Sequence, residues 1–337
     1  MAVSGVVYSG KEVQLGIAQE TTFGTAIADD AAFVQIPEFD SISIDYGLTQ
    51  DFSLKNRGKR IAYDADLYAS QTGGTRVITI SGMVLRRTEI AEWLYGVFQN
   101  VSEGATTPYE KTFSVADDQP DFASDEGYFF TLGIKNPITA YDEKYTSCIV
   151  RELTISGDMV GGDGRLMADV TIISGFAAGT TSTFSGTWTI STQNYFDANL
   201  FDTKTYNTAD LVLYGFSVTI NNNAKRIGND SSGDAEGYAI GVPEIEITGN
   251  LNVKYDANTQ GALADSLAGT EHIIEFGLAD GSASGDIMFD FNEAILTTVD
   301  RDDNRDEGVS RTLNFKGVAN SGATPEIRVA DGVDQAW

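Results

Sequence analysis

Residues 76–99 read RVITISGMVLRRTEIAEWLYGVFQ, and this stretch holds the two patterns that decide the fold. Its first part alternates β-branched with small polar residues, which predicts a half-buried strand over Arg76–Val84. The period then changes from two to 3.6, because apolar residues recur on one helical face: Ile90, Trp93, Leu94, Val97 and Phe98. Thr88 is a suitable N-cap for this helix, and the face is expected to be core, packed across a sheet.

The second half of the chain repeats this order. Phe216–Ile220 matches Asp40–Ile44, and Glu244–Gly249 matches Val77–Gly82. A short helix candidate over Thr259–Ala268, with Leu263 and Leu267 one turn apart, occupies the place of Thr88–Gln99. The hairpin expected over Glu293–Gly317 then matches the one over Glu152–Gly175. Such self-similarity predicts a tandem duplication of one β-rich module.

The spacing between matched elements locates an insertion. The strands lie 167 residues apart (Ile78 to Ile245), whereas the hairpins lie 141 apart (Glu152 to Glu293). The 26-residue difference is the length of an acidic, loop-like segment, 102–127, which is therefore assigned as an insertion in the first copy.

The predicted fold is mainly β, with two tandem β-sandwich or partial-barrel modules that each carry one short α-helix. The boundaries are an N-terminal arm (1–32), a first module (33–175, with a long loop over 45–75), a connector (176–209), a second module (210–320) and a C-terminal arm (321–337). A loop as long as 45–75 in a compact domain is usually functional or a contact element.

Composition excludes several classes of protein. The net charge of −27 repels phosphates, so specific DNA or RNA binding is not expected. The acidity indicates either simple solubility or a surface that must not hold a polyanion passing over it. Cys148 is the only cysteine, so no intrachain disulfide can form. We expect neither a signal peptide nor a membrane span, because no apolar stretch approaches about 20 residues.

No catalytic constellation stands out, and neither an enzyme nor a cofactor is predicted. The single histidine, His272, lies in a strand pattern without a nucleophile beside it. Asp300, Asp302 and Asn304 copy EF-hand positions 1, 3 and 5, but Arg305 stands where that loop needs glycine. They form a weak metal-site candidate, and the alternative interpretation is a solvated turn between the last two strands.

The segment GIAQETTFGTA, residues 16–26, resembles the opening of the tail tube proteins of long-tailed bacteriophages, and the order strand, helix, hairpin in each half is similar to the tail tube module. The resemblance to the double-module type implies trimeric, pseudo-hexameric rings stacked around a lumen for DNA passage. Its implied partners are further copies of the chain and the tail tip, tail terminator and tape measure proteins. It implies assembly in the host cytoplasm and a place in the virion tail, without membrane insertion.

In that family the long loop and the terminal arms reach the neighbouring ring. The inter-ring contact candidates implied here are, in the loop, Lys55, Arg57, Lys59 and Arg60 and, in the N-terminal arm, Glu20 and Phe23. The basic cluster has the alternative interpretation of solvated loop charges. A lumen lined by Asp and Glu would repel phosphates. Two other functions stay open from the residues alone: another structural β protein, such as a capsid decoration or surface-layer subunit, and a Ca²⁺-dependent carbohydrate-binding module.

Overall fold

The structure is a computed structural model that describes residues 12–28, 30–47, 49–51, 68–70, 74–87, 89–106, 109–116, 118–137, 142–176, 184–190, 195–229, 234–242, 244–278, 285–304, 308–319 and 324–330. This part of the chain is mainly β with two α-helices, as the sequence predicted. None of its helices is long and apolar enough to cross a membrane.

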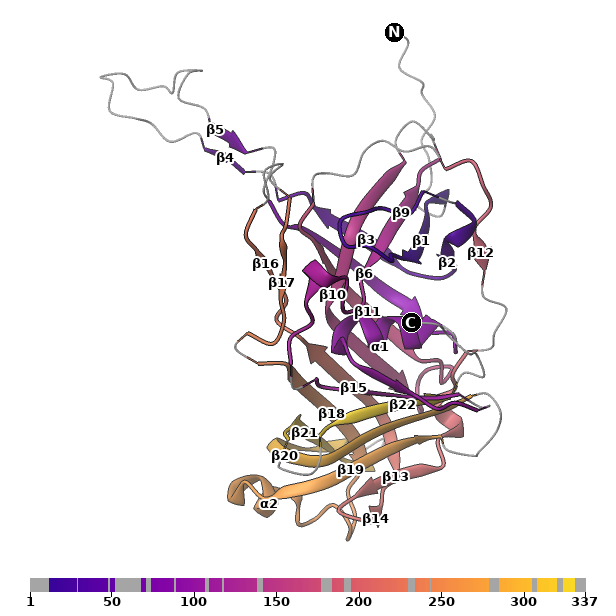
Figure 1. The fold of residues 1–337 in the computed structure, drawn as a ribbon. Coiled ribbons are helices and arrows are strands. Elements are labelled where there is room, and N and C mark those ends of the chain that lie inside the picture. Colours follow the sequence, from indigo (N-terminus) through magenta and orange to yellow (C-terminus); the bar gives the residue numbers. More distant parts are fainter. Residues whose placement is uncertain are drawn as a thin grey trace, which may run out of the picture.

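One large antiparallel sheet organises the molecule (Figure 1). Its strands lie side by side in the order β3 (Ser41–Asp45), β6 (Arg76–Val84), β11 (Met167–Ser174), β10 (Glu143–Asp158), β15 (Leu213–Asn221), β18 (Glu246–Lys254), β21 (Gly308–Gly317) and β20 (Asp286–Asn304). The first four strands lie within residues 41–174 and the last four within residues 213–317, and we call the parts of the chain around them the first half and the second half.

Two long strands, β10 and β20, leave this sheet and continue into further ladders. The first part of β10 pairs with β9 (Phe130–Lys135), and the ladder goes on through β1 (Gln14–Gln19) and β2 (Val34–Ile36) to β12 (Thr189–Ile190). The change of direction in β10 falls at a bulge that includes Ser147, whose φ of 44° is left-handed.

The first part of β20 is paired on both sides. One neighbour is β19 (Glu271–Leu278), followed by β13 (Thr203–Tyr206) and β14 (Ala209–Asp210). The other neighbour is β22 (Glu326–Ala330), followed by β8 (Glu110–Ser114) and β7 (Val101–Glu103). Two small ladders complete the strands. They are β16 (Lys225–Ile227) with β17 (Gly237–Ala239), and β4 (Thr49–Asp51) with β5 (Tyr68–Ser70), which stands away from the body in Figure 1.

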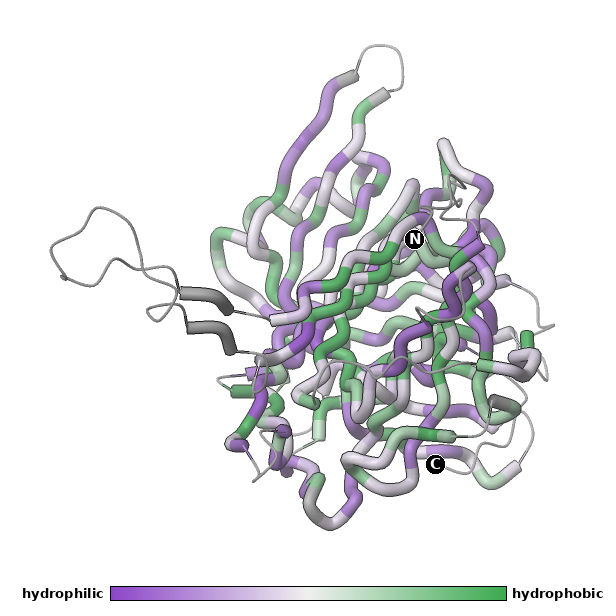
Figure 2. The backbone as a smooth tube through the Cα atoms, turned by 90° about the horizontal axis from the view of Figure 1, so that it is seen from above, coloured by the Kyte–Doolittle hydropathy of each residue, from purple (hydrophilic) through white to green (hydrophobic). Residues whose placement is uncertain are grey.

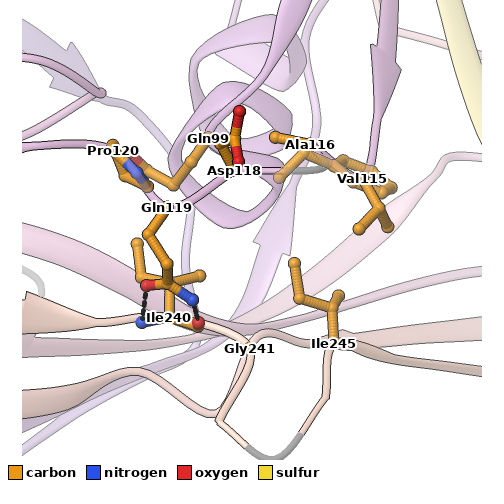
Figure 3. A pocket seen from close by; sticks show the side chains of 10 residues that line it. Gln99, Val115, Ala116, Asp118, Gln119, Pro120, Ile240, Gly241 and Ile245 are labelled. Carbon is orange, nitrogen blue, oxygen red and sulfur yellow. Dashed lines mark hydrogen bonds between the residues drawn. The ribbon is translucent and has the colours of Figure 1, made fainter.

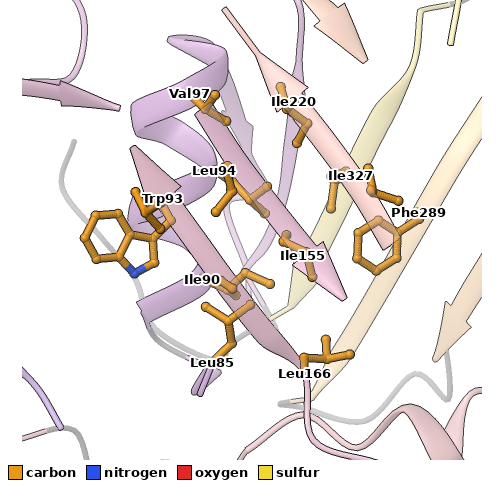
Figure 4. Packing of buried hydrophobic residues seen from close by; sticks show 14 of the residues in the cluster. Leu85, Ile90, Trp93, Leu94, Val97, Ile155, Leu166, Ile220, Phe289 and Ile327 are labelled. Atoms are coloured by element: carbon orange, nitrogen blue, oxygen red, sulfur yellow. The ribbon is translucent and has the colours of Figure 1, made fainter. Parts of the chain in front are cut away.

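The stretch quoted above folds as its two periods predict. The strand β6 covers Arg76–Val84, and α1 covers Glu89–Phe98 and packs on β10. The predicted N-cap, Thr88, lies outside the described residues. In Figure 4 Ile90, Leu94 and Val97 of α1 lie against the strands that carry Ile155 and Ile220. The predicted face is at most 1% exposed: Ile90, Trp93, Leu94, Val97 and Phe98. Burial of each such side chain contributes roughly 1.5–3 kcal/mol.

Glu89 at the first position of α1 should make stability depend on pH. Its side chain is 3% exposed, and burial raises its pKa from 4.5 to about 7, although Arg86 nearby lowers it. A raised carboxyl pKa stabilises the fold at low pH, and this contribution is lost as the pH rises through about 7. The wild type should therefore lose up to about 3 kcal/mol of stability between pH 5 and pH 8 through this group, and Glu89→Gln should not show this loss. Urea unfolding of both proteins at the two pH values measures this, and equal pH dependence would contradict it.

The second helix differs from its expected role. The structure places α2 at Ala262–Ala268, ended by Gly269 in a left-handed conformation with φ of 63°. Ala262 is buried, but Leu263 is 49% exposed and Leu267 is 82% exposed. The leucines do share one face, as their spacing predicts, but this face points away from the core of the chain.

Several segments expected to be loop, connector, turn or arm contain strands, among them β4 and β5 in the loop 45–75 and β12 and β13 in the connector. The insertion 102–127 includes β8, which pairs with β22 from the expected C-terminal arm. Residues 300–304 are not a turn, because they continue β20 and pair with β21 from Thr312 to Gly308. The strands β8 and β22 are distant in sequence, so hydrophobic periodicity within each segment could not reveal their pairing.

Candidate assembly edges and polar sheet face

The two halves of the chain repeat one order of strand pairing. In the first half the order is β1, β9, β10, β11, β6, β3. In the second half it is β13, β19, β20, β21, β18, β15. Ile44 pairs with Ile78, and its counterpart Ile220 pairs with Ile247. The alignment of Ile78 with Ile245 is therefore displaced by two residues, which keeps every side chain on its face because the strand period is two.

The halves meet where β10 pairs with β15, and we call this pairing the internal joint. It runs in register from Glu152 opposite Asn221 to Asp158 opposite Gly215. The hydroxyls of Thr154 and Thr219 lie 2.9 Å apart across it, and the Asn221 amide donates to Glu152 Oε2 at 2.7 Å. Continuous backbone pairing makes the two halves one sheet.

Asn222 ties the end of β15 to α1. Its side chain is fully buried and donates to the carbonyl oxygens of Val97 (3.0 Å) and Val150 (2.7 Å), while its Oδ1 accepts from the backbone N–H of Ala224 (3.0 Å). The C-terminal end of α1 therefore lies over the internal joint. A buried polar side chain with this many partners is expected to hold one arrangement of the elements that it links.

Replacing Asn222 by alanine should destabilise the subunit by about 2–4 kcal/mol, because two buried carbonyls lose a donor and one N–H loses its acceptor. Chemical denaturation measures the change. Asn252→Ala, at an exposed position on β18, is the matched control and should change stability by less than about 0.5 kcal/mol. Equal effects of the two substitutions would argue against Asn222 as the tie.

A second contact between the halves comes from the acidic insertion. Figure 3 shows the Gln119 side chain reaching the backbone of Ile240: its Oε1 accepts from the Ile240 N–H at 2.8 Å, and its amide donates to the Ile240 carbonyl. The two residues line a pocket of about 160 Å³ together with Phe98 at the end of α1. Its small volume and backbone contacts indicate a packing gap between the halves rather than a ligand site.

The large sheet has two open edges among the described residues. At one end β3 pairs only with β6, and at the other the Leu296–Asn304 part of β20 pairs only with β21. Open edges offer unpaired backbone donors and acceptors to another strand. The apolar residues of β3 that face the core, Ile42 and Ile44, are only half-buried, whereas their counterparts Val218 and Ile220 are fully buried at the internal joint.

The face of the large sheet opposite the core is polar. In Figure 2 hydrophobic and hydrophilic stretches alternate along the strands, as expected when one face is packed and the other is not. This polar sheet face is formed by Ser41, Ser43, Asp45, Thr79, Ser81, Glu152, Thr154, Ser156, Asp169, Thr171, Ser217, Thr219, Asn221, Glu246, Thr248, Asn250, Asn252, Lys254, Thr298, Asp300, Thr312, Asn314 and Lys316.

Hydroxyl and amide side chains dominate this face, and its few charges are mostly negative. Of its cations, Lys254 is exposed at the end of β18, whereas Lys316 lies 2.8 Å from Glu244 and 3.7 Å from Glu246, and the hydrogen bond to Glu244 raises the pKa of Lys316. The Lys316 ammonium is already paired with carboxylates. The face therefore offers little positive charge to a polyanion.

The two inter-ring candidates of the N-terminal arm contact the body of their own subunit, where Glu20 is buried and Phe23 is half-buried. Glu20 is 4% exposed, and its carboxylate accepts from Thr131 Oγ1 (2.5 Å), Ser147 Oγ (2.5 Å) and the Ser147 N–H (2.9 Å). Burial raises the pKa of Glu20, and these hydrogen bonds lower it. Phe23 packs among four aromatic rings of both halves: Phe122, Phe129, Phe176 and Tyr238. Both residues fasten the arm to the body of their own subunit.

For the remaining candidate residues, the described part of the structure indicates neither a binding site nor a catalytic site. Lys55, Arg57, Lys59 and Arg60 lie outside the described residues. Asp300 and Asp302 are exposed on an extended strand, and the described residues contain no group of three or more His, Cys, Asp or Glu side chains that could hold a metal ion. Cys148 is fully buried, and burial raises the pKa of its thiol well above the usual value.

A comparison with protein families gives a match over nearly the whole length. The profile of the phage tail tube protein family matches residues 10–334. The chain belongs to this family. It is a structural component of a phage tail, and proteins of this tail tube family are typically not enzymes. No curated protein sequence matches the chain significantly.

A tail tube protein works by assembling with other tail proteins, so the open edges and the polar sheet face are candidate surfaces for that assembly. Sequence reasoning missed the open edges, Asn222 and Gln119, and it named Leu263 and Leu267 without indicating that they are exposed. The pairing of Ile-rich strands was visible in the sequence, but which strand is last in a sheet was not.

Proposed function

We propose that this tail tube protein closes into trimeric, pseudo-hexameric rings by repeating its internal joint between subunits. The observation that carries the proposal is that the two strands of the internal joint, β10 and β15, have counterparts, β20 and β3, that are the open edges of the same sheet. If β20 of one copy pairs with β3 of the next, every module meets its neighbours in the same way. A ring of double-module chains then needs no unpaired edge.

The repeated pairing order predicts the register between subunits. Ile78 and Ile247 are counterparts, so their partners Ile172 and Gly317 are counterparts too. Two residues earlier on the same strands, Val170 therefore corresponds to Phe315. Their partners on the next strands, Leu153 and Leu296, are therefore counterparts, and both are buried.

The pairs of the internal joint can then be transferred to the contact between copies. Leu153 opposite Ile220 becomes Leu296 opposite Ile44 of the next copy. Thr154 opposite Thr219 becomes Thr298 opposite Ser43. A bulge at Thr297 accounts for the extra residue on β20.

The polar sheet face then forms the wall of the lumen. DNA that passes such a wall releases few counterions, because the face presents hydroxyls, amides and sparse carboxylates and its Lys316 is already paired. Weak interaction suits a conduit, since phosphates are neither bound nor repelled strongly enough to stop the strand.

Stacking of rings completes the proposed tube. The basic cluster Lys55–Arg60 remains our candidate for contacts to acidic loops of the next ring, with tail tip, tail terminator and tape measure proteins as further partners. The tandem division into modules at 33–175 and 210–320, and assembly in the host cytoplasm, belong to the same proposal. It is supported by the family match and by the repeated pairing order.

Electron microscopy of the purified protein at high concentration tests the proposal. Hollow tubes or stacked rings are expected, and a monodisperse monomer at every concentration would contradict it. Flat lattices would instead favour a surface-layer subunit, and binding to phage heads a capsid decoration protein. Calorimetric titration with Ca²⁺ and a glycan panel tests the carbohydrate-binding alternative, for which no heat of binding is expected.

A further inference from the structure

The two helices start from corresponding places on the sheet. At the entrance to α1 the backbone N–H of Leu85 donates to the Leu166 carbonyl at 2.9 Å, just before β11. At the entrance to α2 the Arg311 guanidinium on β21 donates to the Thr259 carbonyl at 2.5 Å. From these points α1 runs over β10, and α2 runs over β20.

The two helices also end alike. Gln99, with φ of 60°, follows α1, and Gly269, with φ of 63°, ends α2. Counting back two residues from each left-handed residue places Val97 and Leu267 at corresponding positions. The carbonyl of Val97 accepts the hydrogen bond from Asn222, so the end of α1 lies over the last residues of β15. Figure 4 shows Val97 on the same side of the strands as Ile220.

The exposure of the corresponding residues is opposite. At the internal joint Val97, Val218 and Ile220 are all fully buried. At the open edges Leu267 is 82% exposed, Leu263 is 49% exposed, and Ile42 and Ile44 are half-buried. The apolar surfaces that a single copy leaves uncovered are therefore the ones that the internal joint covers.

We propose that Leu263 and Leu267 on α2 form a docking surface for β3 of a second copy of this chain, with Leu267 lying over Ile42 and Ile44. The inference rests on the proposed ring and names the apolar contact that supports its strand pairing. The occupant is a second copy because the internal joint already displays such a contact, with α1 in the place of α2 and β15 in the place of β3.

Leu267→Asp tests this surface. The variant should fold with an unchanged melting temperature, because Leu267 is 82% exposed in the single chain. Its assembly into rings or tubes should require a protein concentration at least roughly tenfold higher than the wild type, since an aspartate would be buried without a partner against apolar side chains. Light scattering across a concentration series, with electron microscopy of the end points, measures the shift.

Two matched variants control the experiment. Leu200→Asp changes another exposed leucine, 56% exposed and remote from both open edges in sequence, and should assemble like the wild type. Leu267→Met keeps an apolar side chain and should also assemble. Normal assembly of Leu267→Asp, or equal loss in Leu200→Asp, would overturn the leucine surface. Absence of rings from the wild type would overturn the ring itself, so the two failures are distinguishable.

Discussion

Mild oxidation of a subunit that carries both Ser43→Cys and Thr298→Cys is expected to produce a covalent trimer. In the proposed register these two residues lie opposite each other on β3 of one copy and β20 of the next, as Thr219 and Thr154 do at the internal joint. The hydroxyls of that internal pair are 2.9 Å apart, so the side chains of the pair face each other closely. Opposite residues on antiparallel strands have Cβ atoms about 4.5–5.5 Å apart, near enough for a disulfide after a small adjustment.

The size of the cross-linked product distinguishes a closed ring from an open chain of subunits. A closed ring has no free pair of cysteines left, so the series of cross-linked species on a denaturing gel should stop at the trimer, whereas an open chain of subunits would continue to larger species. The native Cys148 should not interfere, because it is fully buried and burial raises the pKa of its thiol.

Register is tested by a shifted pair. Ser41→Cys with Thr298→Cys moves one thiol two residues along the same face and should cross-link poorly, and either single variant should stay monomeric on the gel. The proposed register would be contradicted by efficient cross-linking of the shifted pair, or by no cross-linking of the matched pair in assembled tubes. Neither result would contradict assembly itself.

The parts of the fold that the sequence predicts are those in which neighbours along the chain determine the outcome. The strand Arg76–Val84 and the helix after it follow from local hydrophobic periods, and the structure reproduces both. The pairing of β8 with β22 could not be predicted in this way, because residues more than 200 positions apart meet there.

The leucines of α2 show a different limit. Their spacing indicates a shared apolar face, but periodicity does not say whether the partner of that face is the same chain or another copy. Glu20 and Phe23 show the reverse. Their place in a terminal arm suggested an outward contact, whereas within the subunit Glu20 is buried among three donors and Phe23 is half-buried among four aromatic rings.

Lysines placed on the polar sheet face should impair DNA passage without impairing assembly. Thr79 and Thr248 are the clearest positions, because they correspond in the two halves and point to the same face. In the proposed ring, Thr79→Lys with Thr248→Lys puts a cation at every module position around the lumen. Each phosphate contact then releases counterions, so DNA should be retained, and the release rate should fall by on the order of tenfold or more near 50 mM salt.

Salt dependence separates this electrostatic effect from a distorted tube. Raising the salt from about 50 to 200 mM should restore much of the release rate of the lysine variant and change the wild type little. Thr79→Gln with Thr248→Gln adds similar bulk without charge and should behave like the wild type at both salt concentrations. Release would be followed by the fluorescence of a DNA-binding dye after tail-bearing particles are triggered, with micrographs to show intact tubes. Unchanged release from intact lysine-bearing tubes would mean that the polar sheet face does not meet the DNA.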